Sequence, residues 1–412
     1  MTELTPRGTK SCRGCDADEL ISVLDLGEQP LANEMALSQG SPDPAFPLHL
    51  RVCAACGLGQ VGEYVLPERI FGADYPYLSS VSTSWVAHAG QYADSMIKAL
   101  GLGDGDLVME VASNDGYLLS QLQERGLTVL GVEPAHGVAD LARNKGVPTV
   151  AEFFGLELAR RLVDEHGHPR LVAANNVMAH VPDLDDFVAG FAHLCDADTV
   201  ITVENPSFLT LLREAQFDTI YHEHFSYLTA HSVAKAVARH GLELVRVEQL
   251  TTHGGSNRYW LTPAGSRPVH ESVGLTIAHE LESGLLDPDL WERFAATSTS
   301  AIDGLRAWLD ERRAAGRVVA GYGAAAKGNT LMNAARVASD EMVLVVDGSE
   351  QKQGKFLPGS HLPVAAPPAL AEHPVDDVLI LPWNIAPEIG ALVRSLSPNA
   401  TCWIAVPSMQ HL

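Results

Sequence analysis

The chain has 412 residues, of which 46% are hydrophobic, so it is long enough for two or three domains with sizeable cores. Its formal net charge of −23 argues against nonspecific binding to nucleic acids or anionic membranes, although a few local lysines can still hold a phosphorylated substrate. No apolar run reaches the ~18 residues of a membrane-spanning helix, and the N-terminus lacks the apolar core of a signal peptide, so a cytoplasmic protein is expected.

Four cysteines near the N-terminus form two Cys-x-x-Cys pairs, Cys12 with Cys15 and Cys53 with Cys56. Each pair can point two thiolates at one ion, and together they complete a tetrahedral Zn²⁺ site. Four thiolates leave no position for water, so a structural zinc ion is predicted, and a dithiol redox role is the weaker alternative. The long separation of the pairs implies that a small subdomain lies between them, although residues 1–70 show little regular periodicity.

The next block alternates helix and strand. Thr83–Leu100 has the pattern of an amphipathic helix. Strands are expected near 107–111, 128–132, 171–174 and 199–204, with helical stretches between them. This alternation predicts an α/β fold with a parallel, doubly wound sheet.

The loop after the first of these strands resembles a nucleoside pocket. The apolar strand leads to Glu110, small residues follow, a helix begins near Tyr117, and the second strand ends at Glu133, which can accept both ribose hydroxyls. The loop lacks Gly-x-Gly-x-x-Gly and so has no tight pyrophosphate cradle, which favours S-adenosylmethionine over a dinucleotide. The simpler alternative is an ordinary βαβ unit with a polar turn. The predicted cofactor-binding residues are Glu110, Ala112, Ser113, Asn114, Gly116, Leu118, Glu133, Pro134, Asn175 and Asn176.

The segment Tyr-His-Glu-His-Phe-Ser-Tyr-Leu, residues 221–228, is the best candidate for chemistry. Four adjacent titratable side chains are costly to bury, so some of them should line a cleft and provide a general base. The His-x-His spacing lacks the geometry of a zinc-binding helix, which argues against a metal site here. His180 follows the strand near 171–174, at the edge where ligands bind in such sheets. Tyr75 and Tyr77 could cover the site, and packing in a loop is their simpler role.

The last part of the chain contains a second α/β block. Residues 231–262 predict a helix and two strands, and a charged, helix-rich bridge spans 268–314. Further strands are expected near 317–323, 342–346, 377–381 and 402–405. A second, smaller α/β sandwich is therefore expected at the C-terminus.

This block begins with its own glycine loop, residues 321–328, and Asp347 ends the next strand. The loop matches Gly-x-Gly-x-x-Ala, which keeps a nicotinamide oxidoreductase open as an alternative. Lys327 in the first turn of a helix opposes the helix dipole unless an anion binds there. With Lys352 and Lys355 it predicts a diphosphate-binding surface, whereas the simpler interpretation is three solvated lysines.

Six motifs together resemble the deoxysugar C-methyltransferases of antibiotic biosynthesis. They occur in the family's order over nearly the whole chain: the cysteine pairs, Glu-Val-Ala-Ser-Asn-Asp-Gly, Asn-Val-Met-Ala-His-Val-Pro, Tyr-His-Glu-His-Phe-Ser-Tyr, Thr-His-Gly-Gly-Ser, and Gly-Tyr-Gly-Ala-Ala-Ala-Lys-Gly-Asn-Thr. The resemblance implies a zinc-binding domain over 1–70, an S-adenosylmethionine domain over 71–265, and a C-terminal domain over 266–412 that helps to bind a dTDP-sugar. The loop after Asp347 departs from the family's usual Asn-Pro.

The resemblance also implies the reaction, methylation at C3 of a 4-keto-6-deoxyhexose, and the residues that serve it. The catalytic histidine falls on His224, surrounded by Tyr221, Glu223, His180 and Tyr75. The implied substrate-binding residues are Tyr75, His180, Ser256, Asn257, Tyr322, Lys327, Asn329, Lys352 and Lys355. Such a chain could be a monomer. A noncatalytic zinc scaffold is the third possibility, and the polar cluster at 221–224 argues against it.

Overall fold

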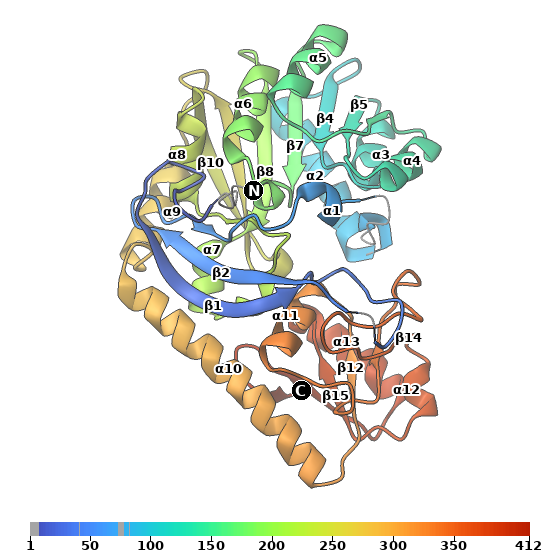
Figure 1. Ribbon diagram of the computed structural model, residues 1–412. Helices are drawn as coiled ribbons and strands as arrows, with labels where there is room; N and C mark the ends of the chain where they lie inside the picture. Colours follow the sequence, from blue (N-terminus) through green and yellow to red (C-terminus); the bar gives the residue numbers. More distant parts are fainter. Residues whose placement is uncertain (1–7, 41, 73–77, 82) are drawn as a thin grey trace, which may run out of the picture. The chain divides into compact units, whose positions relative to one another are not determined.

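The computed structural model describes residues 8–40, 42–72, 78–81 and 83–412, so Tyr75 and Tyr77 lie outside the described residues. The chain divides into two compact units (Figure 1). The first contains, of the described residues, 8–20, Cys53–Ser207 and Phe225–Leu286. The second is assembled from Ile21–Val52, Phe208–His224 and Asp287–Leu412.

A seven-stranded sheet forms the centre of the first unit. Its strand order is β10-β11-β8-β7-β4-β5-β6. The five strands from β8 to β6 are parallel, whereas β11 runs antiparallel to both β8 and β10. The strands are β4 (Leu107–Val111), β5 (Thr128–Val132), β6 (Thr149–Val150), β7 (Leu171–Asn175), β8 (Val200–Pro206), β10 (Leu242–Leu250) and β11 (Ser256–Pro263).

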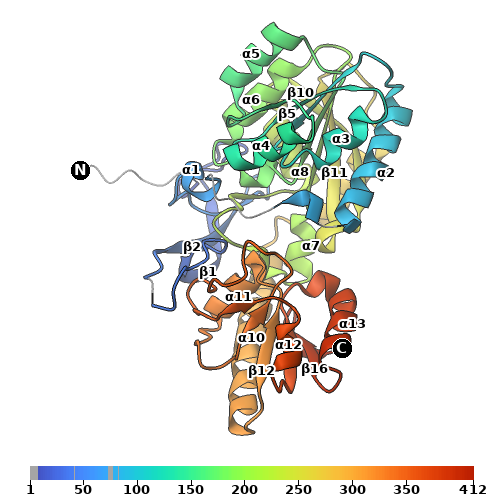
Figure 2. The ribbon, with the colours of Figure 1, turned by 90° about the vertical axis from the view of Figure 1, so that its right-hand side faces the viewer.

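Helices cover both faces of this sheet (Figure 2), because its central strands are apolar on both sides. Val108 and Leu171 pack with one set of helices, while the adjacent Met109 and Val172 pack with the other. The first set is α2 (Thr83–Leu100), α3 (Tyr117–Gln123) and α4 (His136–Asn144); the second is α5 (Leu156–His166), α6 (Leu184–Leu194) and α8 (Ala230–Ala238). The predicted doubly wound α/β fold is confirmed.

Short elements complete the first unit. The cysteine segment contributes β3 (Gly59–Gln60), which pairs antiparallel with β9 (Ser226–Tyr227). The remaining elements are α1 (Pro67–Ile70), α9 (Glu271–Glu282), η1 (Ser79–Val81), η2 (Met178–His180) and η4 (Thr252–Gly254).

The second unit contains a six-stranded sheet with the order β14-β13-β12-β15-β16-β17. All its neighbouring strands are parallel except β16 and β17, and this confirms the second α/β block. The strands are β12 (Val319–Tyr322), β13 (Val345–Val346), β14 (Val364–Ala365), β15 (Asp377–Ile380), β16 (Thr401–Ile404) and β17 (Gln410–His411). The helices are α7 (Phe208–Arg213), η3 (Phe217–Thr219), α10 (Pro288–Ala314), α11 (Ala326–Ala334), α12 (Ala369–Glu372), η5 (Trp383–Ile385) and α13 (Ala386–Leu396).

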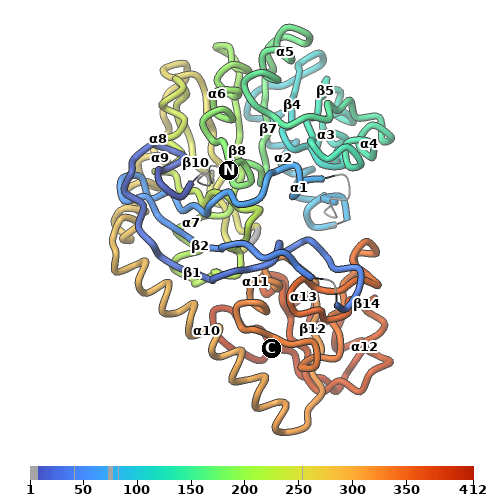
Figure 3. Tube along the Cα trace, in the orientation of Figure 1, coloured from blue at the N-terminus to red at the C-terminus, as the bar shows by residue number. Residues whose placement is uncertain are grey.

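Residues 1–70 contain long strands, although their sequence shows little regular periodicity. Two long neighbouring strands, β1 (Leu20–Pro30) and β2 (Ala45–Cys53), occupy much of that region. Most of both strands belongs to the second unit, where Figure 3 shows them near α11. The segment that connects the two strands is held in the second unit by an antiparallel β-bridge between Ala36 and Phe356. Over the described ranges, no helix is both long and apolar enough to cross a membrane.

Candidate functional site

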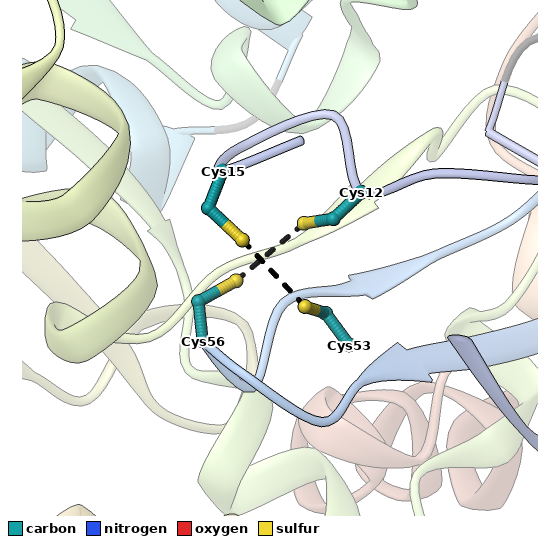
Figure 4. Close-up of side chains that lie close together, drawn as sticks. All are labelled: Cys12, Cys15, Cys53 and Cys56. Atoms are coloured by element: carbon teal, nitrogen blue, oxygen red, sulfur yellow. Dashed lines mark hydrogen bonds between the residues drawn. The ribbon is translucent and has the colours of Figure 1, made fainter. Parts of the chain in front are cut away.

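The four N-terminal cysteines converge on one point (Figure 4). Their sulfur atoms all lie within 4.8 Å of one another. The Sγ atoms of Cys12 and Cys56 are 3.5 Å apart, and those of Cys15 and Cys53 are 3.6 Å apart. Tetrahedral zinc with Zn–S bonds of about 2.3 Å requires sulfurs about 3.8 Å apart, so the cluster fits that ion.

The thiols need a cation at their centre if all four are to ionise. The hydrogen bond with Cys53, together with burial, raises the pKa of Cys12 to about 12. Hydrogen bonds from Cys12 and Cys56 in turn lower the pKa of Cys53 to about 2. One thiolate therefore suppresses ionisation of its neighbours, and a central zinc ion would remove that conflict.

In the first unit, the loop between β4 and α3 makes a sharp, alternating turn. Ala112, Asn114 and Gly116 have positive φ angles of 56°, 49° and 77°. Only one of the three is a glycine, and left-handed conformations in other residues are uncommon and cluster at functional sites. The loop is held by a hydrogen bond from the Ser113 amide to the Val132 carbonyl oxygen at 3.0 Å.

Glu133, which follows β5, is fixed by the same loop. Its Oε2 accepts a hydrogen bond from the backbone amide of Asn114 at 3.0 Å, and its Oε1 accepts one from the backbone amide of Ala135 at 2.9 Å. Each oxygen still has a lone pair, so the carboxylate can also accept ribose hydroxyls.

Glu110 on β4 is nearly fully buried, with 1% of its surface exposed. Within the described part of the chain, its Oε2 has no hydrogen-bond partner. Burial, followed by the charges of Glu133, Asp115 and Glu204, raises the pKa of Glu110 well above its usual value. A buried carboxyl group of this kind fits a cationic ligand, and S-adenosylmethionine carries such groups.

Asn175 and Asn176 lie at the same end of the sheet. Asn175 ends β7, and its Oδ1 is another buried atom without a hydrogen-bond partner among the residues that the structure covers. Asn176 has a positive φ of 54°, and its amide donates to the Glu204 carbonyl oxygen at 2.7 Å. Pro134 lies between β5 and α4, and Leu118 is fully buried in the core under α3.

A buried ion network that was not predicted from the sequence lies at the end of β8. Glu204 accepts hydrogen bonds from Arg258 at 2.7 Å and from His88 at 2.9 Å. Burial alone would raise the pKa of Glu204, but His88 and Arg258 hold it below its usual value. The acidic residue at the end of a predicted strand was the one available signal, because its partners are distant in the sequence.

The other predicted residues of the first unit have partners within that unit. His180 ends η2 and makes an edge-on contact with Phe71, with ring centroids 5.8 Å apart. Ser256 and Asn257 are buried on β11, where Ser256 donates to the Thr252 carbonyl oxygen and Asn257 donates to the Tyr259 hydroxyl.

In the second unit, residues 221–224 form a compact polar cluster. The Tyr221 hydroxyl lies 2.9 Å from Nε2 of His224, and Nδ1 of His224 lies 2.9 Å from the Thr219 carbonyl oxygen. Because a carbonyl oxygen only accepts, Nδ1 of a neutral His224 must carry the hydrogen, which leaves Nε2 as the basic nitrogen.

Glu223 is buried beside this pair. Asn33 donates to both of its carboxylate oxygens, at 2.7 and 2.8 Å. Burial raises the pKa of Glu223 to about 7, against the opposing effects of Asn33 and Lys352. Asn33 was not predicted, because it lies in a turn far from the cluster in the chain and no spacing pattern marks it.

The glycine loop after β12 carries the predicted lysines. Nζ of Lys327 donates to Asn384 at 2.8 Å and lies 4.6 Å from the centroid of the Trp383 ring. Removal from water lowers the pKa of Lys327, and Asp218 opposes that shift. A partly desolvated ammonium group at a helix N-terminus fits a phosphate.

The rest of this loop is held by its own contacts. The Asp347 carboxylate accepts hydrogen bonds from the backbone amides of Ala324 at 2.7 Å and Ser349 at 2.8 Å. Nζ of Lys352 donates to the Ala324 carbonyl oxygen at 2.8 Å. Tyr322 ends β12, Lys355 lies in the loop before β14, and Asn329 is buried in α11.

The predicted cofactor residues lie in one unit, whereas the predicted catalytic and substrate-binding residues are divided between both units. All the predicted cofactor residues and the four cysteines belong to the first unit. Tyr221, Glu223, His224 and the predicted lysines belong to the second unit, whereas His180, Ser256 and Asn257 belong to the first.

Comparison with known families gives three matches along the chain. Residues 12–71 match a zinc-binding domain, residues 86–247 match a methyltransferase domain, and residues 251–407 match the C-terminal domain of C-methyltransferases.

One individual protein is similar over nearly the whole chain. C-methyltransferase NovU from Streptomyces niveus is 35% identical over 389 residues, which cover 93% of this chain and 92% of that protein. Among solved structures, magnesium protoporphyrin IX methyltransferase from Synechocystis is 20% identical, with a TM-score of 0.35, over 48% of this chain and 92% of that one. A protein from Pyrococcus horikoshii is 14% identical, with a TM-score of 0.37, over 48% of this chain and 97% of that one.

Proposed function

The chain belongs to the C-methyltransferase family, and from this premise we propose that it methylates C3 of a dTDP-linked 4-keto-6-deoxy sugar, with His224 as the base. It is an S-adenosylmethionine-dependent enzyme with a zinc-binding cysteine cluster. The family resemblance of the sequence motifs supports a place in the biosynthesis of antibiotic sugars. The oxidoreductase and scaffold alternatives are therefore set aside.

The observation that carries the proposal is the geometry of His224. The Thr219 carbonyl oxygen holds the Nδ1 hydrogen, so the basic Nε2 is turned toward the Tyr221 hydroxyl. A C3–H bond beside a C4 ketone is acidic only when the developing enolate oxygen is stabilised. Nε2 would take the C3 proton, and the electron pair of that bond would move toward the ketone oxygen.

Tyr221 or His180 would donate a hydrogen bond to the enolate oxygen, worth roughly 3 kcal/mol each by analogy with other oxyanion donors. Glu223, fixed by Asn33, would orient a sugar hydroxyl or an imidazole. S-adenosylmethionine, when bound, would supply the electrophilic methyl group that C3 attacks, with cleavage of the C–S bond and S-adenosylhomocysteine as the leaving group. A base and a methyl donor on opposite faces of C3 would give inversion there. Tyr75 stays a predicted sugar contact outside the described residues.

Exchange of the C3 proton with deuterated water tests the base directly. With a dTDP-4-keto-6-deoxy sugar and S-adenosylhomocysteine, His224→Asn should slow this exchange by about 100-fold or more, because a general base contributes about that much. Mass spectrometry of the recovered sugar nucleotide gives the rate.

His222→Asn is the control from the same segment. His222 is buried, and its Nε2 lies 3.2 Å from the Phe46 carbonyl oxygen, away from the proposed chemistry. This variant should keep exchange near the wild-type rate once its folding has been verified by thermal melting. If His224→Asn stops methyl transfer while C3 exchange survives, His224 is not the base.

A further inference from the structure

Two consecutive side chains of α11 hold two loops of the second unit in place. Asn329 donates from Nδ2 to the Ala32 carbonyl oxygen at 2.6 Å. Thr330 donates from Oγ1 to the Ile220 carbonyl oxygen at 3.0 Å. Both side chains are buried, with 1% and 3% of their surfaces exposed. These are tertiary tethers, since each joins residues far apart in the chain.

Each tethered carbonyl lies directly before a residue of the polar cluster or its support. Ala32 precedes Asn33, which donates to both oxygens of Glu223. Ile220 precedes Tyr221, whose hydroxyl contacts His224. One turn of a single helix therefore reaches both sides of the cluster.

These tethers matter because the tethered segments have little regular structure of their own. Residues 31–35 form turns, and 220–225 follow a single 3-10 turn. A buried carbonyl group needs a donor, and here side chains of α11 supply it in place of a strand or helix ladder. Removing a donor would cost the buried pairing and would loosen the loop beyond it.

The N-terminal end of the same helix carries Lys327, three residues before Thr330. At about 1.5 Å per residue, the two lie about 4.5 Å apart along the helix axis. A further contact joins this end to the cluster segment, because Trp383, which lies under the Lys327 ammonium group, donates from Nε1 to Asp218 at 2.8 Å. Asp218 lies in η3, just before Ile220.

We propose that Asn329 and Thr330 are positioning residues that fix Glu223, Tyr221 and His224 at a set distance from the anion-binding end of α11. On this view, the diphosphate of a sugar nucleotide held at Lys327 determines where its sugar meets the base. The inference rests on the proposed function, and it assigns Asn329 a role in holding the Ala32 turn instead of contacting the substrate.

Thr330→Val tests the tether with almost no change of volume. The variant should lower kcat for methyl transfer and the rate of C3 proton exchange by about tenfold or more, since small misplacements of reacting groups are costly. The KM for the sugar nucleotide and the Kd for S-adenosylmethionine should stay within about twofold, because neither the lysine end of α11 nor the cofactor loop is touched. A merely structural role would not produce this split.

Two matched variants complete the test. Thr330→Ser keeps the hydroxyl and should restore exchange to within about threefold of wild type. Thr299→Val removes an exposed helical hydroxyl of the same unit, which donates to the Ala295 carbonyl oxygen one turn earlier in α10, and should change neither rate. If Thr330→Val leaves kcat and exchange unchanged, or if Thr330→Ser is as slow as Thr330→Val, the positioning role is wrong.

Asn329→Ala tests the second tether independently. The variant should release the Ala32 turn and move the Asn33 amide away from Glu223. Because the hydrogen bonds from Asn33 lower the pKa of Glu223, their loss should raise that pKa and move the pH profile of C3 exchange to higher pH. An unchanged profile would contradict the assignment. Failure of the proposed function is a different result, since wild-type enzyme would then exchange no C3 proton of any dTDP-4-keto sugar.

Discussion

Two loops in this molecule share a backbone design but differ in charge. In each unit, a parallel strand leads through a loop of small residues to a helix. The acidic residue after the next strand accepts a hydrogen bond from a backbone amide of that loop. Glu133 accepts the amide of Asn114, and Asp347 accepts that of Ala324. The first loop lies beside the buried carboxyl of Glu110, whereas the second carries Lys327.

The two loops therefore have the same backbone design but offer opposite charges to a ligand. The first loop has carboxyl groups without full compensation and fits a ligand with positive charge, as S-adenosylmethionine has. The second has a partly desolvated ammonium group and fits the negative charge of a diphosphate. A glycine pattern in the second loop alone would have favoured a nicotinamide cofactor.

The largest effect is expected for Glu133→Ala. The variant removes acceptors for two backbone amides and the proposed ribose contact, and hydrogen bonds to charged groups contribute about 1.5–3 kcal/mol each. The Kd for S-adenosylmethionine should rise about 100-fold or more by titration calorimetry. Asp347→Ala should leave that Kd nearly unchanged, so an equal loss in both variants would show that the loops do not bind different ligands.

A smaller effect is expected for Lys327→Met, which keeps the length of the side chain but removes its charge. The Kd for a dTDP-sugar should rise about tenfold to 100-fold, as for the loss of one charge-assisted contact, while the affinity for S-adenosylmethionine stays the same. Lys98→Met, on the surface of α2, is the matched control and should change neither affinity. Unchanged sugar-nucleotide binding in Lys327→Met would remove the basis for an anion site at this loop.

The smallest effect is expected for Glu110→Gln, measured as stability against pH without ligand. Because the pKa of folded Glu110 lies above its unfolded value, its stabilising contribution is complete at low pH and is lost as the pH rises through the folded value. Glutamine cannot ionise, so the variant should avoid this loss, on the order of 1 kcal/mol for each pH unit over which the group titrates. The prediction is wrong if the free energies of unfolding of the wild type and the variant change with pH in the same way.

Much of the fold could be predicted because its signals are local. The helix Thr83–Leu100 was predicted with its observed bounds, and the strands near 107–111 and 128–132 followed from short apolar runs that end in carboxylates. The cysteine cluster followed from spacing alone. These features need only neighbouring residues to be recognised.

The rest depended on contacts between distant residues. The strands β1 and β2 were missed for different reasons: β1 buries only two of its eleven residues and so has no clear alternation, whereas the alternation of β2 was not recognised. Asn33 and Trp383 take part in the polar cluster and the lysine site only through folding, and no spacing rule connects them with residues 218–224. The roles of His224 and its neighbours remain predictions for the experiments above.

The assembly of the second unit from three separate stretches has a consequence for biosynthesis. When a ribosome has made Ile21–Val52, the residues that this segment will contact, in Phe208–His224 and Asp287–Leu412, do not yet exist. This early segment therefore lacks most of its final partners until the C-terminal stretch has been translated, and its apolar side chains stay exposed to other nascent chains until then. A chain truncated before α11 would lack the donors for Ala32 and Ile220, which hold the segments beside the cluster.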